Sequence, residues 1–394
     1  MTRIRSLVVV LAGGAGGRLE LLTHDRAKPA VSFAGTHRLI DFPLSNCLNS
    51  GLSDVWVVQQ FNPMSLSDHL ANGRPWDLDR TVGGLLILQP RLGHDDRGGF
   101  QQGTADALWR NAPLIRDFAP EALVVVSADA VYALDYGALI EEHAEFDADV
   151  TMVTVEVDPE DAGRYGVVQA ADGRVRDYAY KPDAPQGNRV ANEVFAFSPG
   201  PVLDALEAVA DEAGDDGLDD LGDALLPRLV EAGRVREHRF EGYWRDVGTV
   251  DAYWECHQEL LAAEPPIDLD DPAWPMLTHA PSHRATARVL DGAEVRTSLL
   301  APAARVAGRV ERSVVGRGAV VESGAVVRES ILLPGAVVRA GARVDRAILD
   351  DGVEVGRDAV VGKAGGEIAL VGRRASVEPG ARLPAGARHP EPDD

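Results

Sequence analysis

Short apolar runs alternate with amphipathic stretches over the first 260 or so residues of the chain. Runs of this kind are typical of strands buried on both faces of a sheet, and the stretches between them have helical periodicity. The alternation predicts an α/β fold with a Rossmann-like, mostly parallel sheet covered by helices on both faces. The expected strands are Leu7–Ala12, Val55–Gln59, Leu123–Ser127, Val150–Val157, Gly166–Val168, Val175–Tyr180 and Val194–Phe197; the expected helices are Pro43–Ser50, Tyr136–Glu145, Leu203–Val209, Leu225–Ala232 and Val250–Leu261.

The C-terminal part has a different pattern, in which glycines and valines recur at fixed intervals. Glycines at 318, 335 and 352 are spaced by 17 residues, as are those at 324 and 341, and the unit Gly-Ala-Val-Val occurs three times. Hexapeptide units of this kind build the coils of a left-handed parallel β-helix, in which aliphatic side chains point inward and glycines occupy the corners. A low-complexity segment is the alternative, and the regular spacing disfavours it.

These two patterns divide the chain. We expect a first domain over residues 1–262, a linker over 263–284, the β-helix over 285–385 and a disordered tail over 386–394. Residues 211–220 form an acidic run, which is interpreted as a solvated loop or the start of a helix.

Composition limits the classes of function. The 394 residues carry a net charge of −23, which argues against binding to nucleic acid or to an anionic membrane surface. An anionic substrate must therefore be held by a local cluster of basic side chains. The two cysteines, Cys47 and Cys256, fit a reducing cytoplasm, and no apolar run approaches the roughly 20 residues that a membrane helix needs.

The strand expected at Leu7–Ala12 leads directly into a glycine-rich loop with Gly13, Gly14 and Arg18. Glycines let backbone N–H groups converge on a phosphate, and Arg18 and Lys28 add two positive charges. The loop lacks the Gly-Lys-Ser/Thr ending of a P-loop and the third glycine of the dinucleotide-binding fingerprint. A simple tight turn is the alternative, but the two cations favour a polyphosphate site.

Further candidates lie along the chain, each with a plainer alternative. Asp129 follows the strand expected at Leu123–Ser127, where a Mg²⁺ ligand is common, and Asp246 is a possible second ligand or a helix N-cap. Lys181 ends another expected strand and could hold a phosphate monoester. Gly103 and Thr104 could contact a base, or could only begin a helix.

Taken in order, these motifs resemble the sugar-1-phosphate nucleotidylyltransferases, and among them the glucose-1-phosphate adenylyltransferases of bacterial glycogen synthesis. The resemblance runs from about Leu7 to Val361. Its closest stretches are Arg26-Ala-Lys-Pro-Ala-Val31, Arg38-Leu-Ile-Asp-Phe-Pro-Leu-Ser-Asn46, Gly103-Thr-Ala-Asp-Ala107, Tyr243-Trp-Arg-Asp-Val-Gly-Thr249 and Ala252-Tyr-Trp254.

The resemblance implies a nucleotidyltransferase domain that moves AMP from ATP to glucose 1-phosphate, with Mg²⁺ as cofactor. It also implies a homotetramer, or an oligomer with a homologue. Carried over by position, Arg18 and Lys28 are catalytic and bind ATP, together with Gly13, Gly14, Gly103 and Thr104 of the loops around them. Asp129 and Asp246 hold the metal, and Asp129 is also catalytic. Lys181 is catalytic and binds the sugar phosphate with Gly166, and Glu193 is expected to face the sugar as a departure from the family.

The departures from the family pattern concentrate around the sugar. Tyr180 stands where the family has a glutamate, Glu193 where it has a glycine, and Thr36 where it has a lysine linked to activator binding. Two alternatives therefore stay open beside an active enzyme for glucose 1-phosphate. One is a catalytically weak regulatory subunit. The other is an enzyme of altered sugar specificity, for example for an amino sugar 1-phosphate.

Overall fold

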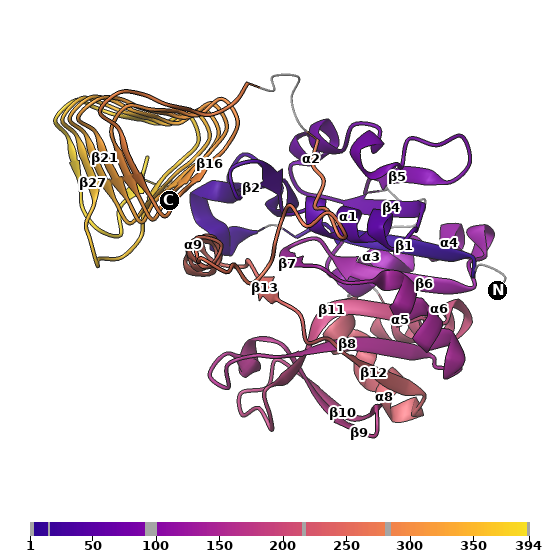
Figure 1. Ribbon diagram of the computed structural model, residues 1–394. Coiled ribbons are helices and arrows are strands. Elements are labelled where there is room, and N and C mark those ends of the chain that lie inside the picture. The colour runs from indigo at the N-terminus through magenta and orange to yellow at the C-terminus, as the bar shows by residue number, and fades with distance from the viewer. Residues whose placement is uncertain (1–3, 15, 91–100, 215–217, 280–284, 392–394) are drawn as a thin grey trace.

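The computed structural model describes residues 4–14, 16–90, 101–214, 218–279 and 285–391. Figure 1 shows two lobes: an α/β lobe built on a central sheet and a triangular stack of short strands at the C-terminal end. Helix α9 (Val250–Glu259) and strand β2 (Ser32–Phe33) lie between them. Three internal stretches fall outside the described residues: residues 91–100, residues 215–217 of the acidic run and residues 280–284 of the expected linker.

The central sheet has nine strands in the order β5-β4-β1-β6-β11-β8-β12-β10-β9. The half from β5 to β6 is parallel, as the sequence predicts. Beyond β6 the sheet is mixed, because β11 runs antiparallel to both of its neighbours and β10 runs antiparallel to β12 and β9. The strands are β1 (Ser6–Ala12), β4 (Asp54–Gln59), β5 (Gly84–Leu88), β6 (Ala122–Ser127), β8 (Val150–Glu156), β9 (Gly166–Ala171), β10 (Arg174–Tyr180), β11 (Arg189–Phe197) and β12 (Val235–Arg239).

Helices cover both faces of this sheet. Within β1, Leu7 and Val9 belong to the core on one face and Val8 and Val10 to the core on the other, which explains the unbroken apolar run in the sequence. The helices are α1 (Asp41–Asn49), α2 (Pro63–Leu70), α3 (Thr104–Arg110), α4 (Ala112–Phe118), α5 (Tyr136–Glu145), α6 (Pro199–Ala213), α7 (Leu221–Ala224), α8 (Leu226–Ala232) and α9; the 3-10 turns are η1 (Gly17–Thr23), η2 (Lys28–Ala30), η3 (Arg74–Trp76) and η4 (Ala162–Arg164).

Two small antiparallel pairs complete the α/β lobe. Strand β2 pairs with β3 (His37–Arg38), and β7 (Ala130–Tyr132) pairs with β13 (Trp244–Asp246). The second pair places Asp246 opposite Ala130, although 116 residues separate them in the sequence. Sequence periodicity does not reveal strands of two or three residues, so neither pair was expected.

The C-terminal lobe is a left-handed parallel β-helix of three six-stranded sheets, as predicted. Val321, Val338 and Val355 are stacked partners, which reproduces the 17-residue repeat. Glycines 318, 324, 335, 341 and 352 all have φ between 67° and 76°, so they turn the corners in a conformation that other residues rarely adopt. One sheet holds β14 (Arg288–Val289), β17 (Arg305–Val306), β20 (Val320–Val321), β23 (Val337–Val338), β26 (Glu354–Val355) and β29 (Ser376–Val377); the second holds β15 (Glu294–Arg296), β18 (Arg309–Glu311), β21 (Val326–Arg328), β24 (Arg343–Asp345), β27 (Val360–Gly362) and β30 (Arg382–Leu383); the third holds β16 (Leu299–Leu300), β19 (Val314–Val315), β22 (Ile331–Leu332), β25 (Ala347–Leu349), β28 (Ala369–Val371) and β31 (Arg388–His389).

The expectation of a disordered tail from residue 386 is wrong for its first part. Arg388 and His389 form β31, which pairs with β28, and the Arg388 guanidinium binds the Glu20 carboxylate of the α/β lobe. This pairing and this cross-lobe contact order the chain through residue 389. Residues 392–394 lie outside the described part.

The segment expected as a linker has no regular structure, but its described part is fixed along α1. Leu277 exchanges hydrogen bonds with Ser45, Trp274 donates to Asn46 Oδ1 at 2.9 Å, and His37 Nε2 lies 2.9 Å from the Met276 carbonyl oxygen. The lobes also share a hydrophobic core, in which α9 and η1 pack against β-helix residues such as Ile331 and Leu370. The α/β lobe and the β-helix are therefore joined by an extensive packed contact.

Candidate active site

A cavity of about 710 Å³ opens at the carboxyl ends of β1 and β6. This is the edge at which ligands bind in open α/β sheets, and the volume suits a nucleotide-sized ligand. The structure brings ten of the eleven residues selected from the sequence to its wall: Gly13, Gly14, Arg18, Lys28, Gly103, Thr104, Asp129, Gly166, Lys181 and Glu193. The eleventh, Asp246, is not among the lining residues, but its Oδ1 lies 3.8 Å from Lys28 Nζ.

The glycine-rich loop leaves β1 and turns into η1. Gly16 has φ of 71°, and a Cβ there would lie 2.9 Å from the Thr23 side chain and 3.0 Å from that of Lys28, so only glycine fits. The Thr23 hydroxyl donates to the Gly16 carbonyl oxygen at 2.9 Å and ties the loop to the end of η1. Gly14 has open space beside it, and the Arg18 side chain is exposed in the cavity.

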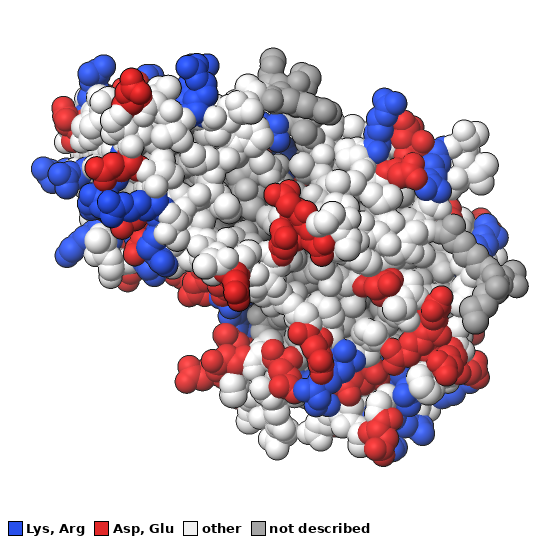
Figure 2. Space-filling view, in the orientation of Figure 1, with Lys and Arg blue, Asp and Glu red and all other residues white. Residues whose placement is uncertain are grey.

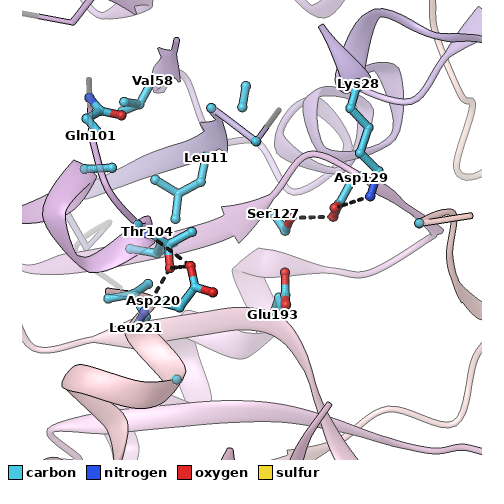
Figure 3. A pocket seen from close by; sticks show the side chains of 18 of the residues that line it. Leu11, Lys28, Val58, Gln101, Thr104, Ser127, Asp129, Glu193, Asp220 and Leu221 are labelled. Carbon is cyan, nitrogen blue, oxygen red and sulfur yellow. Dashed lines mark hydrogen bonds and ion pairs between the residues drawn. The ribbon is translucent and has the colours of Figure 1, made fainter. Parts of the chain in front are cut away.

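Lys28 and two carboxylates form a charged cluster at one end of the cavity. The buried Lys28 ammonium lies 2.6 Å from Asp129 Oδ2 and 3.8 Å from Asp246 Oδ1, while the Ser127 hydroxyl donates to Asp129 at 2.5 Å. The β7–β13 pair fixes the two carboxylates side by side, since the Val247 N–H donates to the Asp129 carbonyl oxygen. Figure 3 shows Lys28, Asp129 and Ser127 of this cluster.

The charges in this cluster shift one another's pKa values. Burial would raise the pKa of Asp129, but Lys28 and the Ser127 hydroxyl outweigh it, and the pKa lies below its usual value. The pKa of Asp246 is raised by burial and by the Asp129 charge. Burial lowers the pKa of Lys28, yet Asp129 and Asp246 raise it more, so Lys28 is held as a cation.

The opposite end of the cavity carries Lys181 and two tyrosines. Lys181 Nζ lies 2.6 Å from Tyr180 Oη and 3.9 Å from Asp220 Oδ2, and the Tyr180 hydroxyl donates to Asp220 at 2.7 Å. Glycines allow these rings to approach closely: a Cβ on Gly166 would lie 2.3 Å from Tyr178 Oη, and one on Gly222 would lie 2.3 Å from the Tyr180 ring.

Glu193 enters the cavity from an irregularity in β11, where the register shifts between Ala191 and Phe195. Its φ is 64°, in the left-handed region. The pKa of its carboxyl is raised to about 7, first by loss of solvation inside the cavity and then by the charges of Asp129 and Asp246. Figure 3 shows Glu193 between the Lys28–Asp129 pair and the Asp220 cluster.

Gly103 and Thr104 line the cavity and also support its wall. The Thr104 hydroxyl donates to Asp220 Oδ1 at 3.2 Å and accepts from the Leu221 N–H at 2.8 Å. Its proton and one of its two lone pairs are therefore used within the protein. A Cβ on Gly103 would lie 2.3 Å from the Asp219 backbone. Both residues therefore hold the 219–221 segment against α3.

Several cavity residues were missed in the sequence. Asp220 belongs to the acidic run that was interpreted as a solvated loop or the start of a helix; it stands directly before α7, and its side chain receives hydrogen bonds from Thr104 and Tyr180. An aspartate directly before an apolar helix start is an N-cap signal, and it could have drawn attention to this position. Gln60 and Gln101 exchange two hydrogen bonds, at 2.9 Å and 2.7 Å, across the cavity wall and carry no recognisable sequence signal.

Comparison with known families agrees with this geometry. The model described as "Nucleotidyl transferase" matches residues 7–263, and the one described as "GlmU-like, C-terminal hexapeptide" matches residues 281–367. The first match covers more than half of the chain and both lobes are accounted for, which defines the class: the protein is a nucleotidyltransferase.

Similar curated proteins narrow the class. "Glucose-1-phosphate adenylyltransferase" of Thermomicrobium roseum is 44% identical over 74% of this chain and 68% of its own length. Proteins of the same name from Thermotoga maritima and Bacillus licheniformis are 40% and 39% identical over 82% and 78% of this chain, and over 76% and 81% of their own lengths. The chain belongs to the glucose-1-phosphate adenylyltransferase family.

Nucleotidyltransferases generally use a divalent metal ion, and the donor set here fits one. Asp129 and Asp246 are adjacent carboxylates whose mutual repulsion a divalent cation would relieve. Within the described ranges no group of three or more His, Cys, Asp or Glu side chains is arranged to hold a metal. Two carboxylates suit an ion such as Mg²⁺ that completes its coordination with substrate phosphates.

Two simpler expectations also have structural outcomes. Cys47 and Cys256 are free and buried. None of the helices in the described residues has the length and apolar character needed to cross a membrane.

Proposed function

We propose that the protein transfers AMP from ATP to glucose 1-phosphate, releasing pyrophosphate and forming ADP-glucose for glucan synthesis, with Mg²⁺ as its metal ion. The observation that carries this proposal is the cluster of Lys28, Asp129 and Asp246 beside the glycine-rich loop in one cavity. The names of the similar curated proteins support the same reaction.

In this reaction two anions must approach each other. An oxygen of the sugar phosphate attacks the α-phosphorus of ATP, the new P–O bond forms, and the bond to the bridging oxygen breaks as pyrophosphate leaves. Much of the barrier is charge repulsion, so positioned cations can lower it without a protein nucleophile. Mg²⁺, held by Asp129 and Asp246, supplies charge neutralisation on the triphosphate when bound.

The chain's own residues divide the remaining work. Arg18 projects into the cavity from the glycine-rich loop and neutralises the triphosphate. Lys28, kept charged by its two carboxylates, is fixed close to the metal ligands and holds the reacting phosphates. Lys181, at the end of β10, holds the attacking phosphate in line with the α-phosphorus.

The test is release of pyrophosphate from ATP and glucose 1-phosphate, with and without Mg²⁺. We expect release only with metal, and a loss in kcat on the order of 10²-fold or more in Asp129→Asn and in Arg18→Ala. Asp68→Asn, an exposed carboxylate of α2, is the matched control and should leave the rate unchanged. Metal-independent turnover, or a wild-type rate in Asp129→Asn, would contradict the assignment.

A regulatory subunit is the competing candidate, and the same assay addresses it. Absence of turnover with every nucleotide and sugar phosphate, together with activation of an added catalytic homologue, would establish that role instead. The five charged groups Arg18, Lys28, Asp129, Lys181 and Asp246 are all present around the cavity, and this supports turnover.

Assembly and location are part of the proposal. Val289, Leu290 and Leu299 are exposed on the first coil of the β-helix, which supports self-association, with a homotetramer as the expected state and a complex with a homologue as the alternative. Light scattering after size exclusion measures the mass directly. Two free cysteines, both buried, support a location in the reducing cytoplasm.

A further inference from the structure

The sugar end of the cavity contains a carboxylate without a positively charged partner. In the part of the chain that the structure describes, Lys28 pairs with Asp129 and Asp246, and Lys181 lies near Asp220, but no cationic side chain lies within 4.0 Å of Glu193. Its carboxyl also has no hydrogen-bond donor among those residues. The side chain is exposed to solvent on the cavity wall, so its charge is free to pair with a ligand that enters the cavity.

The side chain of Glu193 reaches the cavity through a strained backbone conformation. Glu193 adopts φ of 64°, a conformation that residues with a Cβ avoid and glycine does not. Such strain persists where the surroundings impose it and is concentrated at functional sites. The shift in register between Ala191 and Phe195 provides that constraint. It keeps the Glu193 carboxylate on the cavity wall.

The surroundings of Glu193 are dominated by negative charge. Asp129, Asp246 and Asp220 all raise the pKa of the Glu193 carboxyl, and Lys28 only partly opposes them. Two phosphorylated reactants add more negative charge to the same space. A ligand with a positively charged group beside Glu193 would relieve this repulsion, and a neutral hydroxyl would not.

A metal ion is a poor candidate for this cation. Among the residues that the structure describes, Glu193 does not join Asp129 and Asp246 in a group able to hold a metal. Glu193 instead adds to the effect of burial and raises the pKa of Tyr178 and Tyr180, and the Tyr180 hydroxyl lies 2.6 Å from Lys181 Nζ. Figure 3 shows Glu193 apart from the Lys28–Asp129 pair. The missing positive charge is therefore best supplied by the sugar.

We infer that the cavity selects a hexose 1-phosphate that carries a free amino group over glucose 1-phosphate, with Glu193 as the specificity-determining residue. This inference rests on the proposed adenylyl transfer and deepens it. The ammonium of the sugar donates to the Glu193 carboxylate, while Lys181 holds the phosphate. An N-acetylated amine is neutral and bulkier, so it gains nothing from this carboxylate.

The experiment compares kcat/KM for pyrophosphate release with ATP, Mg²⁺ and four sugars: glucose, glucosamine, galactosamine and N-acetylglucosamine 1-phosphates. One charge-assisted hydrogen bond corresponds to about a ten- to hundred-fold preference. We expect at least one of the free amines to be preferred over glucose 1-phosphate by this factor, and the N-acetylated sugar to be the poorest.

Two substitutions separate charge from shape. Glu193→Gln should remove the preference for the amine, and Glu193→Gly should both remove it and improve turnover of glucose 1-phosphate, because the side chain and the backbone strain are gone. Asp172→Asn and Asp172→Gly are matched controls: Asp172 is also acidic, exposed and left-handed, with φ of 52°, but it lies in the β9–β10 turn and does not line the cavity. They should leave the sugar preference unchanged.

The outcomes are distinguishable. Turnover in which glucose 1-phosphate equals or exceeds both free amines overturns this inference and leaves the proposed function in place. A preference for an amine that survives in Glu193→Gln also overturns it. No pyrophosphate with any of the four sugars overturns the proposed function, and this inference with it.

Discussion

At the scale of single residues, the cavity depends on backbone conformations that most side chains avoid. Lys181 and Glu193, which face the sugar end, have φ of 44° and 64°. Both positions are disfavoured for residues other than glycine, yet both carry charged side chains. The strain is balanced by the surrounding sheet, since β10 and β11 are paired on both sides. Substrate specificity can thus change through one residue without a change of fold.

Glu193 also predicts a pH dependence of stability in the metal-free protein. The pKa of its carboxyl is about 7 in the folded state and about 4.3 when unfolded, so the folded protein binds an extra proton between these values. The contribution of Glu193 to stability is therefore full below the unfolded pKa and is lost as pH rises through about 7. Glu193→Gln should gain stability relative to wild type as pH rises from 4 to 8.

Thermal unfolding in the presence of a chelator measures this difference. The melting temperature of Glu193→Gln minus that of wild type is expected to increase steadily across the window. A difference that is flat between pH 4 and pH 8 would mean that the carboxyl titrates alike in both states. Asp172→Asn provides the reference, because Asp172 is exposed.

The sequence was sufficient to find the charged residues and insufficient to pair them. Arg18, Lys28, Asp129 and Lys181 were recognised as strand-end or loop residues, and they line one cavity. Asp220 was not recognised, because an acidic run is usually solvated, and only tertiary packing turns Tyr180 and Thr104 toward it. Contacts between distant segments leave no local periodicity to detect.

At the scale of elements, the loop between β1 and η1 determines how phosphate can be approached. Gly16 is required by its backbone, since a Cβ there would contact Thr23 and Lys28. A Cβ on Gly14 would meet no atom within 4 Å, so the role of this glycine is to leave space in the cavity. Two neighbouring glycines therefore serve stability and ligand access respectively.

This difference predicts opposite behaviour for two similar substitutions. Gly16→Ala should lower the free energy of unfolding by about 1–2 kcal/mol, because alanine is strained at positive φ. Gly14→Ala should leave stability within about 0.5 kcal/mol and raise KM for ATP. Urea denaturation and steady-state kinetics measure the two effects. Equal losses of stability in both variants would contradict the distinction.

Most of the long apolar strands were predicted, although β5 (Gly84–Leu88) is apolar and was missed. Strands such as β1 and β6 have uninterrupted valine and leucine runs. Strand β12 was missed because its sequence, Val-Arg-Glu-His-Arg, is largely charged. The antiparallel course of β9 and β10 was also missed, although Asp172 and Gly173 between them form the kind of Asp-Gly turn that favours hairpins.

At the scale of the whole molecule, the β-helix supports the segment that carries Arg18 and Lys28. Glu20 binds Arg388, Leu21 contacts the residue after β28, Arg26 binds Asp350, and the Gly35 carbonyl oxygen accepts from Arg317. The lobes differ in charge as well. Figure 2 shows basic and acidic side chains interspersed on the β-helix, with acidic ones prevailing on the α/β lobe.

The buried ion pair across the lobes gives a quantitative prediction. Arg26 and Asp350 are 3% and 0% exposed, and Arg26 also donates to Asp351 at 3.0 Å. Removing one partner of such a pair costs about 3–5 kcal/mol, so Arg26→Met should unfold much more readily than wild type. Asp350→Leu in the same chain should restore part of the loss.

The exposed cross-lobe pair is the matched control. Glu20→Gln removes the carboxylate that binds Arg388, and because this pair is partly solvated the loss should be at most about 1 kcal/mol. Chemical denaturation of the variants provides the measurement. An Arg26→Met variant no less stable than Glu20→Gln would show that the buried pair does not hold the lobes together.

The β-helix residues that contact residues 20–35 lie in or directly after β31, β28, β25 and β19. These four strands belong to one sheet of the β-helix. Successive contacts along the segment therefore fall on four different coils of the stack. If one whole coil between Arg317 and Arg388 were lost or gained, every contact residue beyond it would move by about 4.8 Å, the spacing of neighbouring strands. The length of the coils varies only at the other corners of the β-helix. The longest coil has its extra residues between β27 and β28, away from the corner that contacts residues 20–35. The contacts with residues 20–35 thus constrain the number of coils in the β-helix.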